Sequence, residues 1–190
     1  MPVVHKEAFM KKKVPLDIAY RLINHGPVVL VSTFYRGRPN VCTAAWVTPV
    51  DAAILAVVIS DENYSFRCIR GTGEFVLNIP HRALIKKVIA CGSVSGEHCD
   101  KFSKFGLTPL PARKVRAPLV GECIGHLECR LIGGEERLAR NYNLFLARVV
   151  AASAERGLFT TYWNVRVPRA RTLHHLGGSV FAVPSGTIAR

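Results

Sequence analysis

The chain has 190 residues and a formal net charge of +13; hydrophobic residues make up 49% and charged residues 21%. This apolar share excludes an intrinsically disordered chain, and the length fits one domain. No apolar run approaches the roughly 20 residues of a membrane-spanning helix, and the start lacks an apolar block followed by a small-residue cleavage site. We therefore expect one cytoplasmic domain over residues 1–190, without a secretory signal, that starts with a basic segment, residues 1–13.

The first third of the chain predicts one short helix and three strands. Apolar residues at helical spacing predict a helix over residues 14–25, which a Gly-Pro pair ends. Runs rich in β-branched residues predict a strand over 28–34 and a returning strand over 41–47, joined by a Gly- and Pro-containing turn at 36–40. The uninterrupted apolar run 53–60 predicts a strand that is covered on both faces.

The middle of the chain alternates short helices with a strand. Residues 65–71 read as a short helix that ends on glycine, and residues 74–79 as a strand closed by Pro80. Residues 82–90 predict a second helix, because apolar side chains there form one stripe.

The rest of the chain predicts loops and two long strands. Residues 92–106 are polar and glycine-spaced, which indicates a loop, and the proline-punctuated stretch 109–118 indicates a connector. Strands follow over 123–132 and 143–152. Six strands joined mostly by turns favour a mainly β fold, an antiparallel β-barrel with a few short helices, since closure removes the sheet edges. A doubly wound parallel sheet is disfavoured because helices do not alternate with the strands.

Six cysteines occur without any Cys-x-x-Cys pair, so we expect free thiols and neither a zinc knuckle nor a thioredoxin-like redox pair. The one cluster of mixed ligand types is Cys91, His98 and Cys99. Adjacent residues seldom reach the same tetrahedral metal, so the sequence favours thiols in a loop and predicts no metal site.

The positive charge leaves nucleic acid as an alternative partner. However, Lys11-Lys12-Lys13 is the only triple basic run, the other cations are dispersed, and no nucleic-acid-binding motif string occurs. The pattern favours a basic solvated surface that also attracts anionic cofactors. A non-catalytic basic barrel that binds nucleic acid or another anionic partner stays open as the second interpretation.

Signatures of hydrolases and of phosphate-binding Walker loops are absent. Three segments suit a flat aromatic ligand that carries a phosphate: 40–46, 60–67 and 92–101. Small side chains in the first let a planar ring approach the backbone, Ser65 near a helix start suits a phosphate, and the third adds hydroxyls and a cation. Each signal alone is weak, since a serine there is more often only a helix cap.

In combination, these segments resemble the flavin reductase-like family of FMN-binding split β-barrel proteins, and within it the flavoredoxin-like branch. The resemblance covers about residues 14–185. The matching strings, in family order, are Gly37–Trp46, Gly73–Pro80, Cys91–Gly96, Asp100–Phe102, Gly106–Thr108 and Leu127–Arg130.

The resemblance implies a six-stranded Greek-key barrel and a homodimer with FMN at its interface. It also implies electron transfer between a reduced donor, often NAD(P)H, and an acceptor such as free flavin, a partner monooxygenase or another redox protein. No catalytic side chain is assigned, because the flavin supplies the redox chemistry. The cofactor residues that it implies are Asn40, Cys42, Thr43, Ala44, Ala45, Trp46, Ser60, Asn63, Tyr64, Ser65, Cys91, Gly92, Ser93, Ser95, Gly96, Lys101 and Phe102.

The chain also departs from the family pattern. Asn63 and Ser65 stand where the branch tends to carry an arginine and a threonine for the phosphate, so a cation is missing. Arg140-Asn141-Tyr142 replaces a common Gly-Asp-His before the last long strand. The missing histidine favours an electron carrier over an efficient NAD(P)H oxidase. Trp46 fits a core position as well as a ring contact, and Lys101 fits the surface as well as a phosphate contact.

Overall fold

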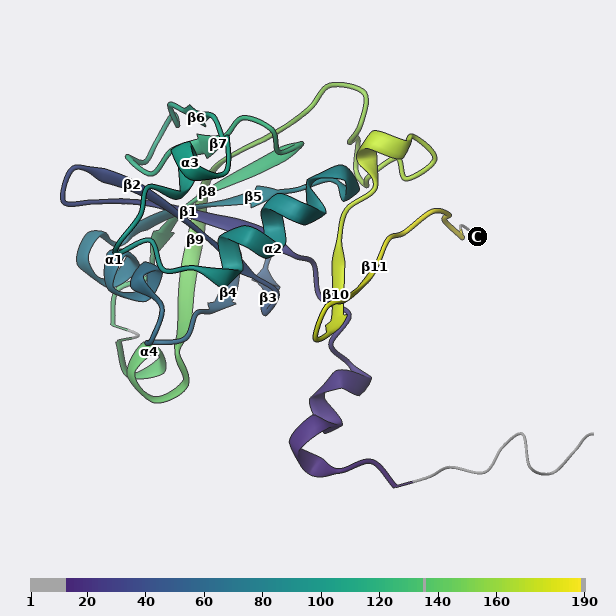
Figure 1. Cartoon of the computed structure of the whole chain (residues 1–190), viewed down its shortest axis with the longest axis horizontal. Helices are drawn as coiled ribbons and strands as arrows, with labels where there is room; N and C mark the ends of the chain where they lie inside the picture. The colour runs from purple at the N-terminus through teal and green to yellow at the C-terminus, as the bar shows by residue number, and fades with distance from the viewer. Residues whose placement is uncertain (1–12, 135, 189–190) are drawn as a thin grey trace, which may run out of the picture.

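A seven-stranded antiparallel sheet forms the body of the structure (Figure 1). The computed structural model describes residues 13–134 and 136–188; the first two lysines of the basic run lie outside them. The strand order is β2-β1-β5-β8-β9-β4-β3. The strands are β1 (Val29–Tyr35), β2 (Arg38–Ala44), β3 (Val47–Asp51), β4 (Ile54–Val58), β5 (Glu74–Ile79), β8 (Gly125–Leu131) and β9 (Leu144–Ala154).

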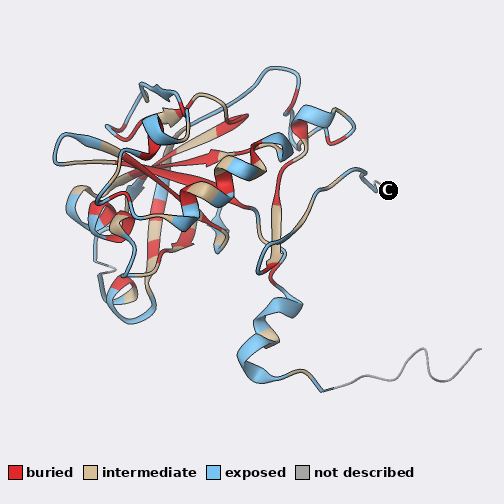
Figure 2. Cartoon of the chain, viewed as in Figure 1, coloured by how far each residue is buried: buried red, intermediate tan, exposed pale blue. Residues whose placement is uncertain are grey.

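The sheet curls into a barrel because its two edge strands follow each other directly in the chain. β2 ends at Ala44 and β3 begins at Val47, although they stand at opposite ends of the strand order. Three residue steps span at most about 11 Å, so the two edges must lie close together. Side chains from β1, β2, β4, β5, β8 and β9 therefore share one buried core, and the inward positions are buried in Figure 2. The predicted mainly β, antiparallel barrel is confirmed.

Short helices cover the outside of this barrel (Figure 1). α1 (Tyr64–Thr72) joins β4 to β5 and ends at Gly73, whose φ of 69° suits glycine. α2 (Ile85–Ser93) continues a 3₁₀ turn, η3 (Arg82–Leu84). α2 and α3 (Lys101–Lys104) pack on β2 through a second apolar core.

No helix of residues 13–134 and 136–188 is long and apolar enough to cross a membrane. The remaining elements are β6 (Pro109–Leu110), β7 (Leu119–Val120), α4 (Glu136–Tyr142), η4 (Pro168–Ala170), β10 (His174–Gly177) and β11 (Val180–Ala182).

Three expectations from the sequence were wrong in detail. The strand expected over 41–47 is two strands, which makes seven in place of six, because the chain crosses from one sheet edge to the other at Ala45-Trp46. The loop expected over 92–106 contains the end of α2 and all of α3, whose N-terminus the Asp100 carboxylate caps by accepting from two backbone N–H groups. The helix expected over 14–25 is the shorter 3₁₀ helix η2 (Leu16–Leu22).

The segment with η2 extends from the body of the barrel and buries none of its helical residues (Figures 1 and 2). Leu16 is 91% exposed, Leu22 is 64% exposed and Ile23 is 84% exposed. A 3₁₀ helix of seven residues is longer than usual. Its apolar side chains make few contacts with the rest of the chain. One such contact joins the edge of one ring to the face of the other between Tyr20 and Trp46, whose centroids lie 5.5 Å apart.

A buried amide fastens the barrel to the loop that covers its outer face. Asn78 on β5 is fully buried; its Nδ2 donates to Leu30 O and to Ser32 Oγ, both at 2.9 Å. Its Oδ1 accepts from the backbone N–H of Val120 at 2.8 Å and lies 2.9 Å from Nδ1 of His126. One side chain thus joins β1, β5, β7 and β8.

We expect Asn78→Ala to lower the free energy of unfolding by about 3 kcal/mol, because several buried polar groups lose their partners together. Equilibrium urea unfolding measures this loss. Asn164→Ala is the control, since Asn164 is exposed, and its effect should stay within about 0.5 kcal/mol. Equal effects from both substitutions would contradict the role given to Asn78.

Candidate functional site

The three segments that the sequence predicts to hold a cofactor meet against strand β2. Asn40 on β2 donates from Nδ2 to Ser65 Oγ on α1 at 2.8 Å. Gly96 lies so close to the same amide that a Cβ on it would be 1.8 Å from Asn40 Oδ1. A Cβ on Gly92 would lie 3.3 Å from the Cβ of Thr43. The structure therefore brings together β2, the start of α1 and the residues that follow α2.

Within this cluster, the structure separates residues with buried side chains from residues that a ligand can reach. The buried ones are Asn40, Cys42, Ala44, Ser65, Cys91, Gly96, Lys101 and Phe102. The exposed or half-exposed ones are Thr43, Ala45, Trp46, Ser60, Asn63, Tyr64, Gly92, Ser93 and Ser95. The buried group supports the site from beneath, and the accessible group forms its surface.

The N-terminus of α1 offers free hydrogen-bond donors to this surface. Asn63 is the N-cap residue, and its side chain makes no capping hydrogen bond. The first N–H groups of a helix have no acceptor within the helix, so they can bind an anion. The nearby Arg67 cation is paired with Glu97 at 2.5 Å on the surface. Donation from the backbone is therefore the main attraction for a phosphate here.

Burial shifts the pKa values of three side chains beneath the site. Lys101 is 3% exposed, its Nζ donates to the carbonyl of Cys91 at 2.7 Å, and burial lowers its pKa. This amine holds the end of α2, so the surface position that the sequence left open for Lys101 is wrong, while its phosphate contact stays a prediction. Burial also raises the pKa of Cys42, and that of Cys91 to about 11, which keeps both thiols protonated near neutral pH.

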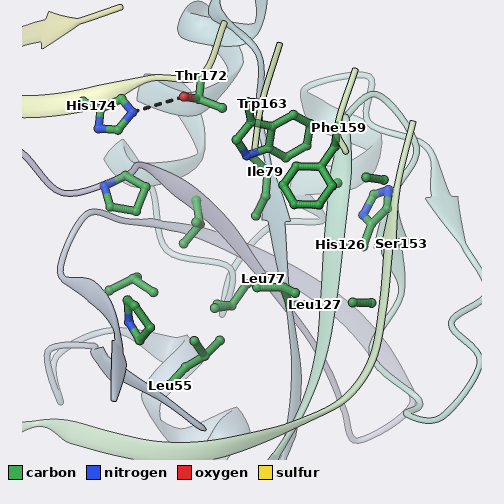
Figure 3. Close-up of a pocket in the computed structure, with 17 residues that line it drawn as sticks. Leu55, Leu77, Ile79, His126, Leu127, Ser153, Phe159, Trp163, Thr172 and His174 are labelled. Atoms are coloured by element: carbon green, nitrogen blue, oxygen red, sulfur yellow. Dashed lines mark hydrogen bonds between the residues drawn. The ribbon is translucent and has the colours of Figure 1, made fainter. Parts of the chain in front are cut away.

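A cavity lies at another part of the barrel (Figure 3). This cavity of about 600 Å³ opens among Leu55, Leu77 and Leu127 of β4, β5 and β8. The rings of Phe159 and Trp163 stand beside it, with centroids 5.1 Å apart in an edge-to-face arrangement. None of the seventeen predicted cofactor residues lines this cavity.

Three of the polar side chains that line the cavity, those of His126, Thr172 and His174, are already partnered within the protein. Oγ1 of Thr172 lies 3.1 Å from Nε2 of His174, and Nδ1 of His174 lies 2.9 Å from the carbonyl oxygen of His25. His126 is bonded to Asn78, as described above. The cavity therefore suits apolar groups and offers little to a phosphate. Sequence reasoning missed it, because its walls come from residues far apart in the chain, such as Val29 and Phe159.

Comparison with known proteins assigns the chain to a family. The model of the flavin reductase like domain matches residues 21–171. The chain belongs to the flavin reductase-like family. An uncharacterized Escherichia coli protein, YddH, is 34% identical over 185 residues, which cover 93% of this chain and 97% of the relative.

Solved structures of this family share the fold. The FMN-binding domain of a flavin reductases-like enzyme from Shewanella baltica is 31% identical, with a TM-score of 0.81 over 93% of this chain and 95% of that one. Flavoredoxin of Desulfovibrio vulgaris is 27% identical, with a TM-score of 0.82 over 95% and 97%. The mainly β split barrel of the flavin reductase-like family is therefore shown for this chain.

The residues present against β2 fit an FMN group. The uncapped start of α1 suits its phosphate, the small side chain of half-exposed Ala45 leaves room for a planar ring, and Gly96 permits a close approach of the chain. Asn40 Oδ1 is, within residues 13–134 and 136–188, the one buried side-chain polar atom without a hydrogen-bond partner. Such an atom is typical of a site that is shaped for function more than for stability.

We expect Gly96→Ala to lower the free energy of unfolding by about 1–3 kcal/mol, because the added methyl group would overlap the Asn40 amide and displace the loop. Gly133→Ala is the matched control: a Cβ there meets nothing within 4 Å, and its effect should be within about 0.5 kcal/mol. Urea unfolding of both variants measures the difference. A Gly96→Ala variant as stable as the control would show that the contact is not tight.

Proposed function

We propose that this protein binds FMN and uses it to move electrons between a reduced donor and an acceptor. The observation that carries the proposal is the family match over residues 21–171, within which the predicted cofactor segments converge on β2. The Shewanella baltica relative is described as an FMN-binding domain and the Desulfovibrio vulgaris relative as a flavoredoxin. FMN supplies the redox chemistry when bound, and the protein positions it.

In this proposal the start of α1 and the residues before it hold the phosphate. Ser60 and Asn63 are accessible there; the N–H of Phe66 donates to the carbonyl of Asn63, which leaves the N–H groups of Tyr64 and Ser65 for the phosphate. The exposed hydroxyl of Ser95 lies on the segment that Gly96 brings against β2, whereas that of Ser93 donates to the carbonyl of Ile89 at 2.7 Å. Half-exposed Ala45 and exposed Trp46 take the ring at the seam of the barrel.

The finer activity that we propose is that of a flavoredoxin-like electron carrier. Arg140-Asn141-Tyr142 supplies no histidine near the start of β9, where a reductase of this family often has one. NAD(P)H:flavin reduction is the competing activity, and exchange of the flavin separates the two. A carrier keeps its FMN through turnover, whereas a reductase that uses flavin as a substrate releases it.

We expect the purified protein to show a flavin absorption spectrum after it is mixed with FMN and desalted. FMN should bind at least about tenfold more tightly than riboflavin, because riboflavin lacks the phosphate and charged hydrogen bonds contribute about 1.5–3 kcal/mol each. Flavin that washes off, together with NAD(P)H consumption in its presence, would indicate a reductase. A protein that takes up no flavin would contradict the proposal and favour the basic barrel that binds nucleic acid.

We also propose that the protein is a homodimer. The apolar side chains in and directly beside η2 and β3 support this, since Leu16, Ile23, Trp46 and Val50 are each more than half exposed. Exposed apolar surface of this extent is typical of a protein–protein interface. Because Trp46 belongs to the predicted cofactor residues, the second copy would lie beside the flavin.

We expect a Leu22→Glu/Ile23→Glu variant to run as a monomer of 20.9 kDa in light scattering after gel filtration, while the wild type has twice that mass. Charges placed in an apolar interface lose hydration without gaining a partner. Leu110→Glu is the control, since Leu110 is 42% exposed on β6, which lies across the barrel from η2 (Figure 1). A wild type that is monomeric at all concentrations would rule the dimer out.

A further inference from the structure

Asn40 lies where the segments of the proposed flavin site meet. Its side chain is 3% exposed. Nδ2 donates to Ser65 Oγ at 2.8 Å and lies 3.4 Å from Thr33 Oγ1 on β1. Ser65 is the second residue of α1. The amide therefore ties the β1–β2 hairpin to the start of the helix that is proposed to receive the phosphate.

The other end of the amide faces the segment that follows α2. Oδ1 is buried without a hydrogen-bond partner, and Gly96 covers it so closely that a Cβ would lie 1.8 Å away. Burying an acceptor without a donor is unfavourable, so the fold alone does not favour an asparagine here. An asparagine whose Oδ1 is buried without a donor while its Nδ2 holds Ser65 points to a role in the site.

We propose that Asn40 is a positioning residue for the flavin phosphate: it holds the start of α1, through Ser65, at a fixed distance from residues 92–96. The inference rests on the proposed function. It differs from the direct ring contact that the family resemblance implies for the segment containing Asn40. The side chain is covered on one side by Gly96 and bonded on the other to Ser65, so it acts through Ser65.

Spacing matters because the proposed phosphate site has two walls. One wall is the start of α1, where the N–H of Phe66 donates to the carbonyl of Asn63 and the N–H groups of Tyr64 and Ser65 are left for a ligand. The other wall is the segment with the exposed hydroxyl of Ser95; the hydroxyl of Ser93 donates to the carbonyl of Ile89. A ligand gains from both walls only when they stand at the right separation, and a misfit of about 1 Å weakens such a site. The buried amide fixes that separation from beneath.

The test is an equilibrium titration of FMN and of riboflavin into the apoprotein, followed by flavin fluorescence. The variants are Asn40→Ala, Ser65→Ala and the double substitution. Each single variant should bind FMN about tenfold more weakly, the loss expected when one positioning hydrogen bond is removed, and should bind riboflavin within about twofold of wild type. The double variant should be no worse than either single one, because both substitutions break the same link.

Two further variants separate positioning from folding. Thr33→Val alters the weaker neighbour of the amide on β1, and its affinity for both flavins should stay within about twofold. Asn40→Leu fills the space and removes the unpartnered Oδ1, while Ser65 Oγ loses its donor; the two effects oppose each other, so its apoprotein should melt close to wild type and yet bind FMN about tenfold more weakly. A purely structural role would instead lower the melting temperature and affect both flavins equally.

The outcomes are distinct. Wild type that takes up neither flavin would overturn the proposed function itself, before any variant is made. Wild type that binds FMN, with Asn40→Leu and Asn40→Ala binding it equally well, would overturn this inference alone. Losses that add in the double variant, or that are the same for riboflavin as for FMN, would also overturn it.

Discussion

The two-residue step from β2 to β3 is the constraint on which the rest of the structure depends. Because Ala45-Trp46 joins the two edge strands, the sheet has to close on itself, and its inward side chains gain a shared core. The seam formed in this way is also the place where strand edges remain: β2 pairs only with β1, and β3 pairs only with β4. Edge strands present unpaired N–H and C=O groups. A ligand with a polar rim can use them, so closure of the barrel and placement of the site have one origin.

The covering of β2 follows from the same constraint. An edge strand of a barrel needs a cover on its outer side, and α2 and α3 provide it through Val88 and Phe102, which pack with Val41 of β2. The chain that links these two helices must then pass along β2. Gly92 and Gly96 allow this passage, since side chains there would press on Thr43 and Asn40. In the sequence, Gly92 and Gly96 indicate only a loop; in the structure, their tertiary contacts with β2 require glycine.

Much of the fold could be predicted from the sequence, because strands and helices leave local patterns. β5 has the predicted bounds, since buried Phe75 and Leu77 alternate with neighbours on the other face and Pro80 follows. The break at Ala45-Trp46 could not be predicted, because it arises from closure between distant strands. The start of α3 did have a local signal, the capping Asp100, which the glycine spacing around it obscured.

The site could be predicted as a list of residues but not as an arrangement. The family resemblance put Asn40, Ser65 and Gly96 on that list, and the structure adds that they touch one another and are buried. Burial depends on what packs above a residue, and no short sequence pattern reports it. The apolar cavity beside Phe159 and Trp163 was missed for the same reason, since its walls are assembled from distant segments.

The distribution of charge has a consequence for how firmly a flavin is held. A net charge of +13 suggests strong attraction for a phosphate, yet α1 has no basic residue in its first turn, and its Arg67 is engaged by Glu97. Asp61 and Glu62, just before the helix, add negative charge at close range. Long-range attraction therefore speeds the arrival of an anion, whereas its retention depends on the short-range donors at the start of α1. If the proposed function holds, the geometry of those donors, which we propose the Asn40–Ser65 link to set, decides whether the protein keeps a flavin as a carrier or exchanges it as a substrate.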